Sequence, residues 1–210
     1  VWDWLDRYYQ KKLNVKLLMI SAEPGYQFLL KAPIGADGGL KGRKIRSNPA
    51  YDQIIIALGG SPVQLSPQET YTALEKGVVD GIGWPQHSVV ALKFNEVTKH
   101  YTRPAFGGAE LLWMINLDRW NKLSAAHQKI LSEVGYEVEK RAYEQSKKIA
   151  EEEEKKMIAA GMTATQFGAD QIKKLEATFN EGIWERAIKR SGKEAEEFIA
   201  LIKEKKVVRQ

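Results

Sequence analysis

Residues 42–83 alternate short extended segments with helical ones, and the connections between them are brief. The extended segments are RKIRS, PVQL and VVDGIGW, and the helical segments between them are AYDQIIIALGG and SPQETYTALEKG. Two neighbouring strands that are joined through a helix pair in parallel, and the crossover is right-handed. This feature restricts the fold more than any other, and it predicts an α/β unit built on a parallel sheet.

The second of these helices has recognisable start and stop signals. Ser66 occupies the N-cap position and Glu69 the third helical position, so the two side chains are placed to cap each other. Pro67 suits the first helical position, and Gly77 follows the last turn. The ends of the strands on either side are therefore well defined.

Arg46 lies at the end of the first strand, beside the turn SNP. Open α/β sheets bind ligands at the carboxyl ends of their strands, whereas Lys44 lies earlier in the same strand. An arginine suits a carboxylate because its planar guanidinium donates two parallel hydrogen bonds and stays charged. Position and residue type therefore make Arg46 a candidate for binding a carboxylate, without deciding the question. The alternative for Arg46 is a surface arginine in a weak salt bridge. We expect Arg43 and Lys44 to be surface residues.

Trp84 ends the third strand, so a parallel sheet brings it to the same edge as Arg46. An aromatic ring at this edge forms a wall for an apolar ligand body, and the alternative is a core tryptophan packed behind Pro85. The chain has no Gly-x-Ser-x-Gly elbow, phosphate loop or dinucleotide glycine fingerprint. His87 and Glu110 are the candidates for a general base, although a packed or solvated role is the simpler interpretation of each.

The rest of the chain is mainly helical. Before residue 42 we expect a helix at 2–12 and a buried strand at 15–22, and we expect another buried strand at 110–120. The tract after Ser124 is one long helix, which at about 1.5 Å per residue spans roughly 50 Å. Two further helices follow it, DQIKKLEATFNEGIWERAIKR and KEAEEFIALIKEK.

Composition and charge restrict the chemistry that the chain can perform. The net charge of +5 is spread along the chain and alternates with acidic residues, without a basic stripe or a zinc-finger pattern, so it indicates a solvated surface. The absence of cysteine excludes disulfides and thiolate metal sites, and the histidines are too scattered for a metal motif. We expect no cofactor and no metal, and no apolar run reaches the length of a membrane span.

The order of three segments resembles one protein family. LKGRKIR, then ALGGSPVQLSPQETYTALEKGVVDG, then KFNEVTKHYT is similar to the substrate-binding subunits of TRAP transporters, the DctP-like periplasmic solute-binding proteins. The resemblance implies an α/β, two-lobed periplasmic-binding-protein-like fold with a long inter-lobe helix. It also implies an exported periplasmic protein, made with a signal peptide, that closes on a small organic acid and delivers it to the membrane subunits of a TRAP permease.

The resemblance also implies roles for individual residues. Arg46 stands at the family's arginine that binds the ligand carboxylate through two hydrogen bonds. Trp84 stands where many sialic-acid and dicarboxylate binders have Asn, and Tyr26 stands where some members have a second arginine. The implied ligand is therefore a monocarboxylate or an aromatic acid. The other expected pocket residues are Asn48, Gln86 and Phe106.

The resemblance implies in addition that family members have about a hundred further residues ahead of Val1, which supply most of the first lobe. We therefore expect residues 1–26 to be a remnant of lobe one and residues 27–108 to be the α/β unit of lobe two. Residues 109–145 return to lobe one, and residues 146–210 pack mainly on lobe two. An incomplete first lobe exposes a sheet edge, so self-association of the chain is a further expectation.

Two other functions stay open at this level. One is an enzyme on the same two-lobed scaffold with His87 or Glu110 as base, which a histidine with a shifted pKa beside a carboxylate would favour. The other is a basic nucleic-acid-binding protein, whose affinity for DNA would depend steeply on salt.

Overall fold

The computed structural model describes residues 1–49 and 51–205. The chain divides into two compact units. The first unit consists of residues 1–23, residues 110–145 and the chain from Trp184 onward, and the second consists of residues 24–109 and 146–183.

Two long helices contribute residues to both units, namely α6 (Ala125–Ala159) and α7 (Ala169–Ser191). α6 has 35 residues, which at about 1.5 Å per residue gives roughly 50 Å. The prediction of one long helix after Ser124 is confirmed. Across the described part of the chain, none of the helices combines the length and the apolar character that a membrane crossing requires.

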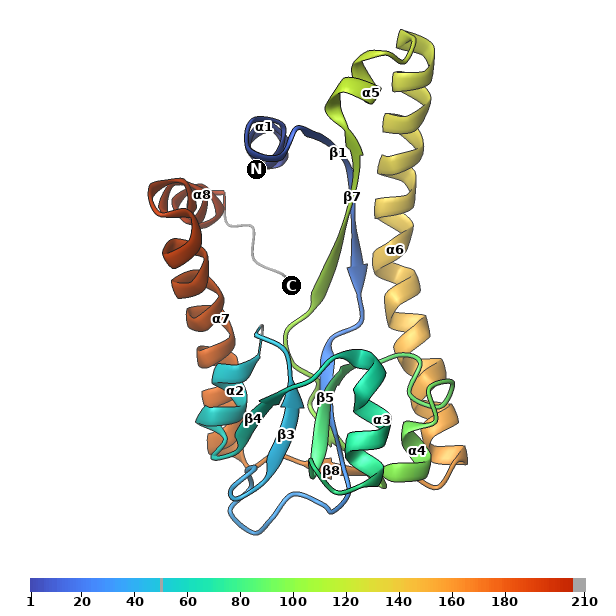
Figure 1. The fold of residues 1–210 in the computed structure, drawn as a ribbon, viewed down its shortest axis with the longest axis vertical. Coiled ribbons are helices and arrows are strands. Elements are labelled where there is room, and N and C mark those ends of the chain that lie inside the picture. Colours follow the sequence, from blue (N-terminus) through green and yellow to red (C-terminus); the bar gives the residue numbers. More distant parts are fainter. Residues whose placement is uncertain (50, 206–210) are drawn as a thin grey trace. The chain divides into compact units, whose positions relative to one another are not determined.

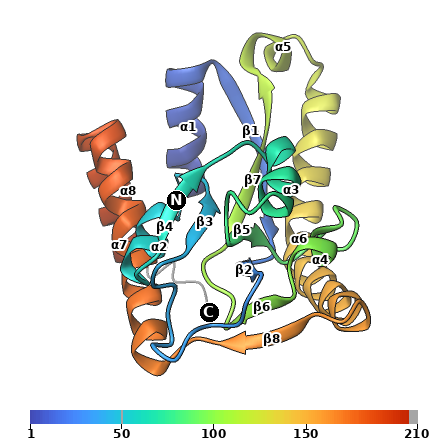
Figure 2. The ribbon, with the colours of Figure 1, turned by 60° about the horizontal axis from the view of Figure 1, so that its bottom comes forward.

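A six-stranded mixed sheet forms the centre of the second unit (Figures 1 and 2). In spatial order its strands are β4 (Ser61–Gln64), β3 (Lys44–Ser47), β5 (Gly81–Pro85), β2 (Tyr26–Leu30), β6 (His100–Arg103) and β8 (Thr163–Gln166). β3 pairs in parallel with β4 and β5, which confirms the parallel pairing predicted for residues 42–83. β2 runs antiparallel to both of its neighbours, β5 and β6.

Helices cover both faces of this sheet. Phe28 and Leu30 of β2 belong to one core cluster and Leu29 to another, because successive side chains of a strand point to opposite faces. The first cluster includes residues of α2 (Asp52–Ala57) and α7, and the second includes residues of α3 (Pro67–Glu75), α4 (Phe94–Val97) and α6. Figure 1 shows α2 on one side of the sheet and α3 on the other. The predicted α/β class is confirmed.

The predicted cap of α3 is present. The backbone N–H of Ser66 donates to the Glu69 carboxylate at 3.0 Å, and the Ser66 hydroxyl donates to the same oxygen at 2.6 Å. These hydrogen bonds from Ser66 lower the pKa of Glu69, because they favour the ionised carboxylate. The cap fixes where α3 begins and therefore where β4 must end.

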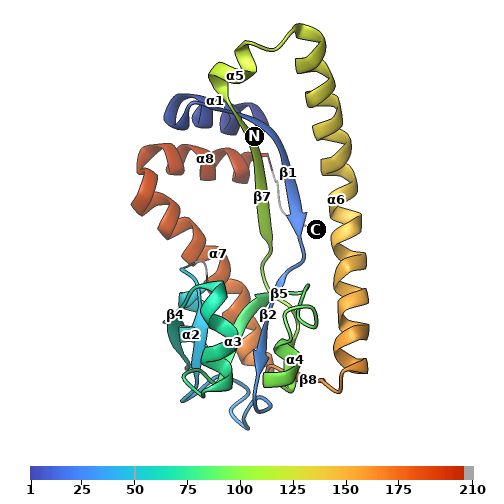
Figure 3. The ribbon, with the colours of Figure 1, turned by 45° about the vertical axis from the view of Figure 1, so that its right-hand side comes forward.

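The first unit has a two-stranded sheet, which β1 (Val15–Glu23) forms with β7 (Ala109–Asn116). Its other elements are α1 (Trp2–Leu13), α5 (Leu117–Asn121), α8 (Lys193–Glu204) and parts of α6 and α7. Figure 3 shows α1 and α8 side by side.

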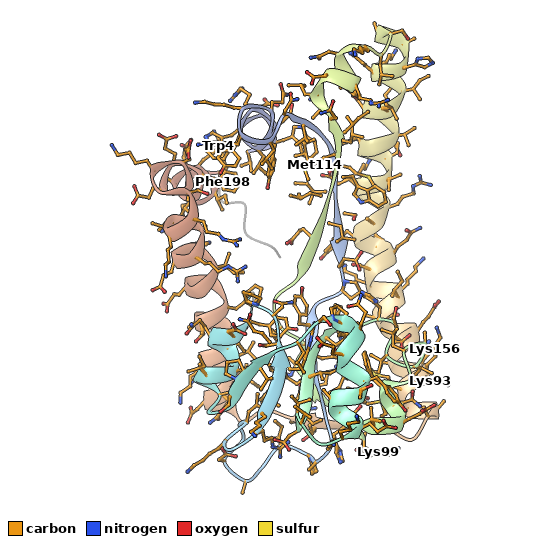
Figure 4. All side chains as sticks on the ribbon, viewed as in Figure 1. Trp4, Lys93, Lys99, Met114, Lys156 and Phe198 are labelled. Carbon is orange, nitrogen blue, oxygen red and sulfur yellow. The ribbon has the colours of Figure 1, made fainter. Side chains whose placement is uncertain are left out.

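Contacts between α1 and α8 explain why the C-terminal helix groups with the first unit. Trp4 stacks on Phe198 with ring centroids 4.8 Å apart, as Figure 4 shows, and Lys12 pairs with Glu194 at 2.7 Å. Our expectation that residues 146–210 pack mainly on lobe two stays a prediction, and within it α8 groups with the first unit. The helical pattern of α8 alone does not reveal this aromatic contact.

Strand β7 is exposed. The side chains of Leu111, Leu112, Trp113 and Met114 are 48%, 36%, 52% and 41% exposed, and Figure 4 labels Met114 on this strand. The sequence predicts a buried strand here because the run is apolar, and that prediction is wrong for these residues. In the described part of the chain β7 has β1 as its sheet neighbour, and the two strands form a sheet too narrow to bury both faces.

Candidate functional site

Arg46 is nearly buried at the end of β3, with 5% of its surface exposed. Its Nε donates to the Leu65 carbonyl oxygen at 3.1 Å, and its Nη1 donates to the Tyr51 hydroxyl at 3.2 Å. Because Nε is already used, the pair of nitrogens that could bind a carboxylate bidentately is Nη1 with Nη2. No described residue accepts a hydrogen bond from Nη2.

The carboxylate nearest to Arg46 in sequence is engaged elsewhere. Asp52, in the first turn of α2, accepts hydrogen bonds from the Ser47 hydroxyl and, at 2.9 Å, from the side-chain amide of Gln64. Within residues 1–49 and 51–205, no Asp or Glu forms an ion pair with Arg46. The site therefore presents a buried positive charge whose hydrogen-bond partners among the described residues are two neutral oxygens.

The neighbouring cations differ from Arg46, and of the two it is Lys44 that is exposed as predicted. The Lys44 side chain is exposed. Arg43 is half-buried and donates to the carbonyl oxygens of Ala32 and Pro33, so it fixes a loop. Among these three cations, burial at the end of the strand distinguishes Arg46.

Trp84 lies beside Arg46. In the parallel pairing of β3 with β5, Arg46 is opposite Ile82, and Trp84 follows two residues later. The Arg46 Cζ lies 5.5 Å from the centroid of the Trp84 ring, and this ring also packs edge-on against Phe94, with ring centroids 4.9 Å apart. The indole Nε1 is buried, and no described residue accepts a hydrogen bond from it. An unsatisfied buried donor of this kind costs about 1–3 kcal/mol.

Tyr51 is a site residue that the sequence reasoning missed. Its hydroxyl donates to the Gly83 carbonyl oxygen at 2.8 Å and accepts from Arg46. Burial raises the pKa of Tyr51 strongly, although the nearby guanidinium of Arg46 acts in the opposite direction. The available signal was Gly83, since a Cβ at this position would lie 2.4 Å from the Tyr51 ring.

Two further aromatic candidates lie near Tyr51. The half-buried Tyr26 ring is 5.1 Å from the Tyr51 ring, and its backbone exchanges two hydrogen bonds with Phe106, each of 2.8 Å. Phe106 is 3% exposed and packs in the core against Phe28. The structure thus brings Tyr26 close to Tyr51 and packs Phe106 in the adjoining core, and a contact of either side chain with a ligand stays a prediction.

The remaining candidates are more peripheral. Asn48 is half-buried in the turn after β3, and its carbonyl oxygen accepts from the Tyr51 N–H at 3.2 Å. Gln86 is half-buried, and its N–H donates to Gly25 at 3.0 Å. Their positions follow the carboxyl ends of β3 and β5, and a direct contact of either side chain with a ligand stays a prediction.

The two candidate bases, His87 and Glu110, belong to different units of the chain. His87 Nδ1 lies 3.0 Å from the Ser88 hydroxyl in the second unit, and Glu110 is an exposed residue of the first unit. In the part of the chain that the structure describes, no group of three or more His, Asp or Glu side chains could hold a metal ion.

Comparison with known proteins gives a family match over most of the chain. The model described as "Bacterial extracellular solute-binding protein, family 7" (DctP) matches residues 1–190. A solute-binding protein of Verminephrobacter eiseniae is 32% identical over 111 residues, which are 51% of this chain and 33% of that protein. The C4-dicarboxylate-binding periplasmic protein DctP of Rhodobacter capsulatus is 37% identical over 87 residues, which are 41% of this chain and 26% of that protein.

The fold is also similar to that of solved structures. A TRAP periplasmic solute-binding protein from Desulfovibrio salexigens, with bound orotic acid, superposes with a TM-score of 0.83 at 24% sequence identity. The superposition covers 95% of this chain and 65% of that chain. The alignments therefore span a third or less of the two curated relatives and slightly less than two thirds of the solved structure.

Proposed function

The chain belongs to the DctP family of bacterial extracellular solute-binding proteins, and from that membership we propose that it captures a small organic acid outside the cytoplasm and delivers it to a TRAP-type membrane permease. Arg46 binds the carboxylate of the acid. The protein binds and releases its ligand unchanged, so it has no catalytic role. It works as an exported, periplasmic partner of the permease subunits.

The observation that supports this proposal most directly is the uncompensated charge of Arg46. A nearly buried guanidinium with neutral partners has lost much of its hydration and has gained no ion pair with any described residue in return. A ligand carboxylate supplies the opposite charge, and Nη1 and Nη2 form the bidentate fork that matches its two oxygens.

Trp84 and Tyr26 favour an acid with a flat or apolar body. Trp84 lies beside the guanidinium, where an amide donor would favour sugar acids, and Tyr26 supplies no second positive charge. A monocarboxylate with an aromatic ring fits these side chains best. Orotic acid, the ligand of the Desulfovibrio salexigens protein, is an acid of this kind, whereas the name of the Rhodobacter capsulatus relative indicates a C4-dicarboxylate.

Thermal-shift measurements with orotate, succinate and N-acetylneuraminate test this proposal. A ligand that binds the native state raises the melting temperature by mass action. Orotate is expected to give the largest shift, and Arg46→Ala is expected to abolish it, because losing one partner of a buried charge pair costs about 2–5 kcal/mol. Lys44→Ala is the matched control, since it removes an exposed cation of the same strand and is expected to leave the shift unchanged.

Two results would contradict parts of the proposal. A tight carboxylate ligand that stabilises the Arg46→Ala protein as well as the wild type would exclude Arg46 as the anchor. A larger shift with N-acetylneuraminate than with orotate would exclude the role given to Trp84. The proposal also requires that Trp84→Asn improve the binding of polar acids. If the substitution brings no improvement, that result likewise contradicts the role given to Trp84.

A further inference from the structure

We propose that Tyr51 is a positioning residue, whose hydroxyl fixes the guanidinium of Arg46 so that its terminal nitrogens face a carboxylate, while leaving its charge available. This inference rests on the proposed function of Arg46. It adds a residue that acts through another and that belongs to none of the positions predicted from the sequence.

The direction of the two hydrogen bonds at Tyr51 follows from its partners. The Gly83 carbonyl oxygen accepts and does not donate, so the single phenolic proton points to it across 2.8 Å. Arg46 Nη1 donates and does not accept, so it meets a lone pair of the same phenolic oxygen at 3.2 Å. The hydroxyl is therefore a fixed acceptor on one side of the guanidinium.

The Leu65 carbonyl oxygen fixes the other side of the guanidinium. This oxygen accepts a hydrogen bond from Arg46 Nε at 3.1 Å, and Leu65 is the residue that follows β4. With Tyr51 at the start of α2 and Gly83 in β5, these contacts connect Arg46 in β3 to three neighbouring elements. A planar group held at Nε and at Nη1 has little freedom to rotate, and its unused N–H groups keep one direction.

Tyr51 orients Arg46 without neutralising it. The phenol stays protonated at neutral pH, since burial raises its pKa. The charged and titratable groups that affect it are Arg46 from β3, Tyr26 from β2 and Asp52 from α2. Asp52 is held by Ser47 and Gln64, so it does not become the counter-ion of Arg46. A carboxylate at position 51 would pair with the guanidinium and compete with the ligand.

Gly83 provides the space that the Tyr51 ring occupies. A Cβ on Gly83 would lie 2.4 Å from Cε2 and 2.8 Å from Cζ of the ring, closer than non-bonded carbon atoms approach. The ring thus lies directly on the backbone of β5. This close approach fixes the height of the hydroxyl over the sheet and therefore the position of the lone pair that Arg46 uses.

A double-mutant cycle separates positioning from a merely structural hydroxyl. Tyr51→Phe keeps the ring and removes the oxygen, and we expect it to lower orotate affinity about tenfold, measured by calorimetry. In an Arg46→Lys background the same change is expected to alter affinity by less than about twofold, because the group that Tyr51 orients is gone. Tyr71→Phe is the matched control. It removes a tyrosine hydroxyl that bonds Glu96 at 2.9 Å elsewhere in the second unit, and affinity is expected to stay at the wild-type value.

Guanidinium NMR of the ligand-free protein tests the same inference without any ligand. In the wild type, Arg46 is expected to show separate, slowly exchanging Nη signals, whereas the exposed Arg119 shows averaged ones. In Tyr51→Phe the Arg46 signals are expected to broaden or average. The wild-type comparison of Arg46 with Arg119 needs no variant, so it holds even where Tyr51→Phe reduces the yield of folded protein.

The outcomes distinguish this inference from the proposed function. Averaged Arg46 signals in the wild type, or an equal loss of orotate affinity on Tyr51→Phe in both backgrounds, would overturn the role of Tyr51. Failure of the wild type to bind orotate or any other carboxylate of the panel would overturn the proposed function, and the NMR comparison would then decide alone whether Tyr51 positions Arg46.

Discussion

The two units of this chain differ in how completely they bury their apolar residues. In the second unit the central strand β2 places Phe28, Leu29 and Leu30 at 0% exposure, with a helical layer on each face of the sheet. In the first unit the apolar run of β7 stays exposed. A charged side chain keeps a fixed position only where well-packed residues surround it. The candidate site residues all belong to the second unit, which has the closed core.

Truncating one leucine in each unit gives the largest expected contrast. Leu29→Ala is expected to lower the free energy of unfolding by about 2–5 kcal/mol, because it leaves a cavity in a closed core. Leu111→Ala removes a side chain that is 48% exposed and is expected to cost less than about 0.5 kcal/mol. Urea unfolding measures both. Equal losses would show that β7 is as well packed in solution as β2.

The exposed run of β7 predicts self-association with a second copy of this chain. Leu111 and Met114 lie on a strand of a two-stranded sheet, and exposed apolar strands of this kind pair with other chains. Sedimentation velocity is expected to show a mass that rises with concentration. The double variant Leu111→Lys with Met114→Lys is expected to stay at the mass of one chain. A wild type that remains a single chain at all concentrations would contradict this prediction.

The smallest expected difference between the two units is in how one buried tyrosine of each affects stability at alkaline pH. An unfolded tyrosine loses its proton near pH 10, whereas burial raises the pKa of folded Tyr51 well above that value. Above about pH 10 the native state therefore binds more protons than the unfolded state, so stability falls as pH rises, and below that pH Tyr51 contributes no dependence. Burial also raises the pKa of Tyr9 in the first unit.

Subtracting the pH profile of Tyr51→Phe from that of the wild type isolates this contribution in urea unfolding between about pH 8 and pH 11. The difference is expected to be flat at the lower end and to decline at the upper end. Tyr9→Phe is the matched change in the first unit. A larger difference for Tyr9 than for Tyr51 would show that the second unit does not hold the more deeply buried phenol.

Sequence reasoning located Arg46 and Trp84 because parallel strands with short connections leave few alternatives. Once β3 and β5 pair in parallel, the residues at their carboxyl ends share one edge of the sheet. Tyr51 escaped detection because its role depends on Gly83, which is 32 positions away and comes near through packing of α2 on the sheet. The order of residue types along the chain does not indicate that the Tyr51 ring packs against Gly83.

Two other features depended on contacts across long sequence separations. β8 is a short strand with mostly exposed side chains, and it forms because β6, which is 63 residues earlier, offers a free edge. In β7 the apolar composition correctly indicated a strand, yet burial depends on which elements cover it. Propensity determined the type of each element, and tertiary neighbours determined its environment.

The unpaired guanidinium of Arg46 also sets two selective pressures against each other. A buried charge without an ionic partner commonly stabilises the folded protein less than an apolar side chain of similar volume does. Selection for heat resistance alone would therefore favour variants that lose Arg46, and such variants would no longer recognise an organic acid. An engineer who improves the stability of this chain should keep that position fixed, because here the stable choice and the useful choice are different residues.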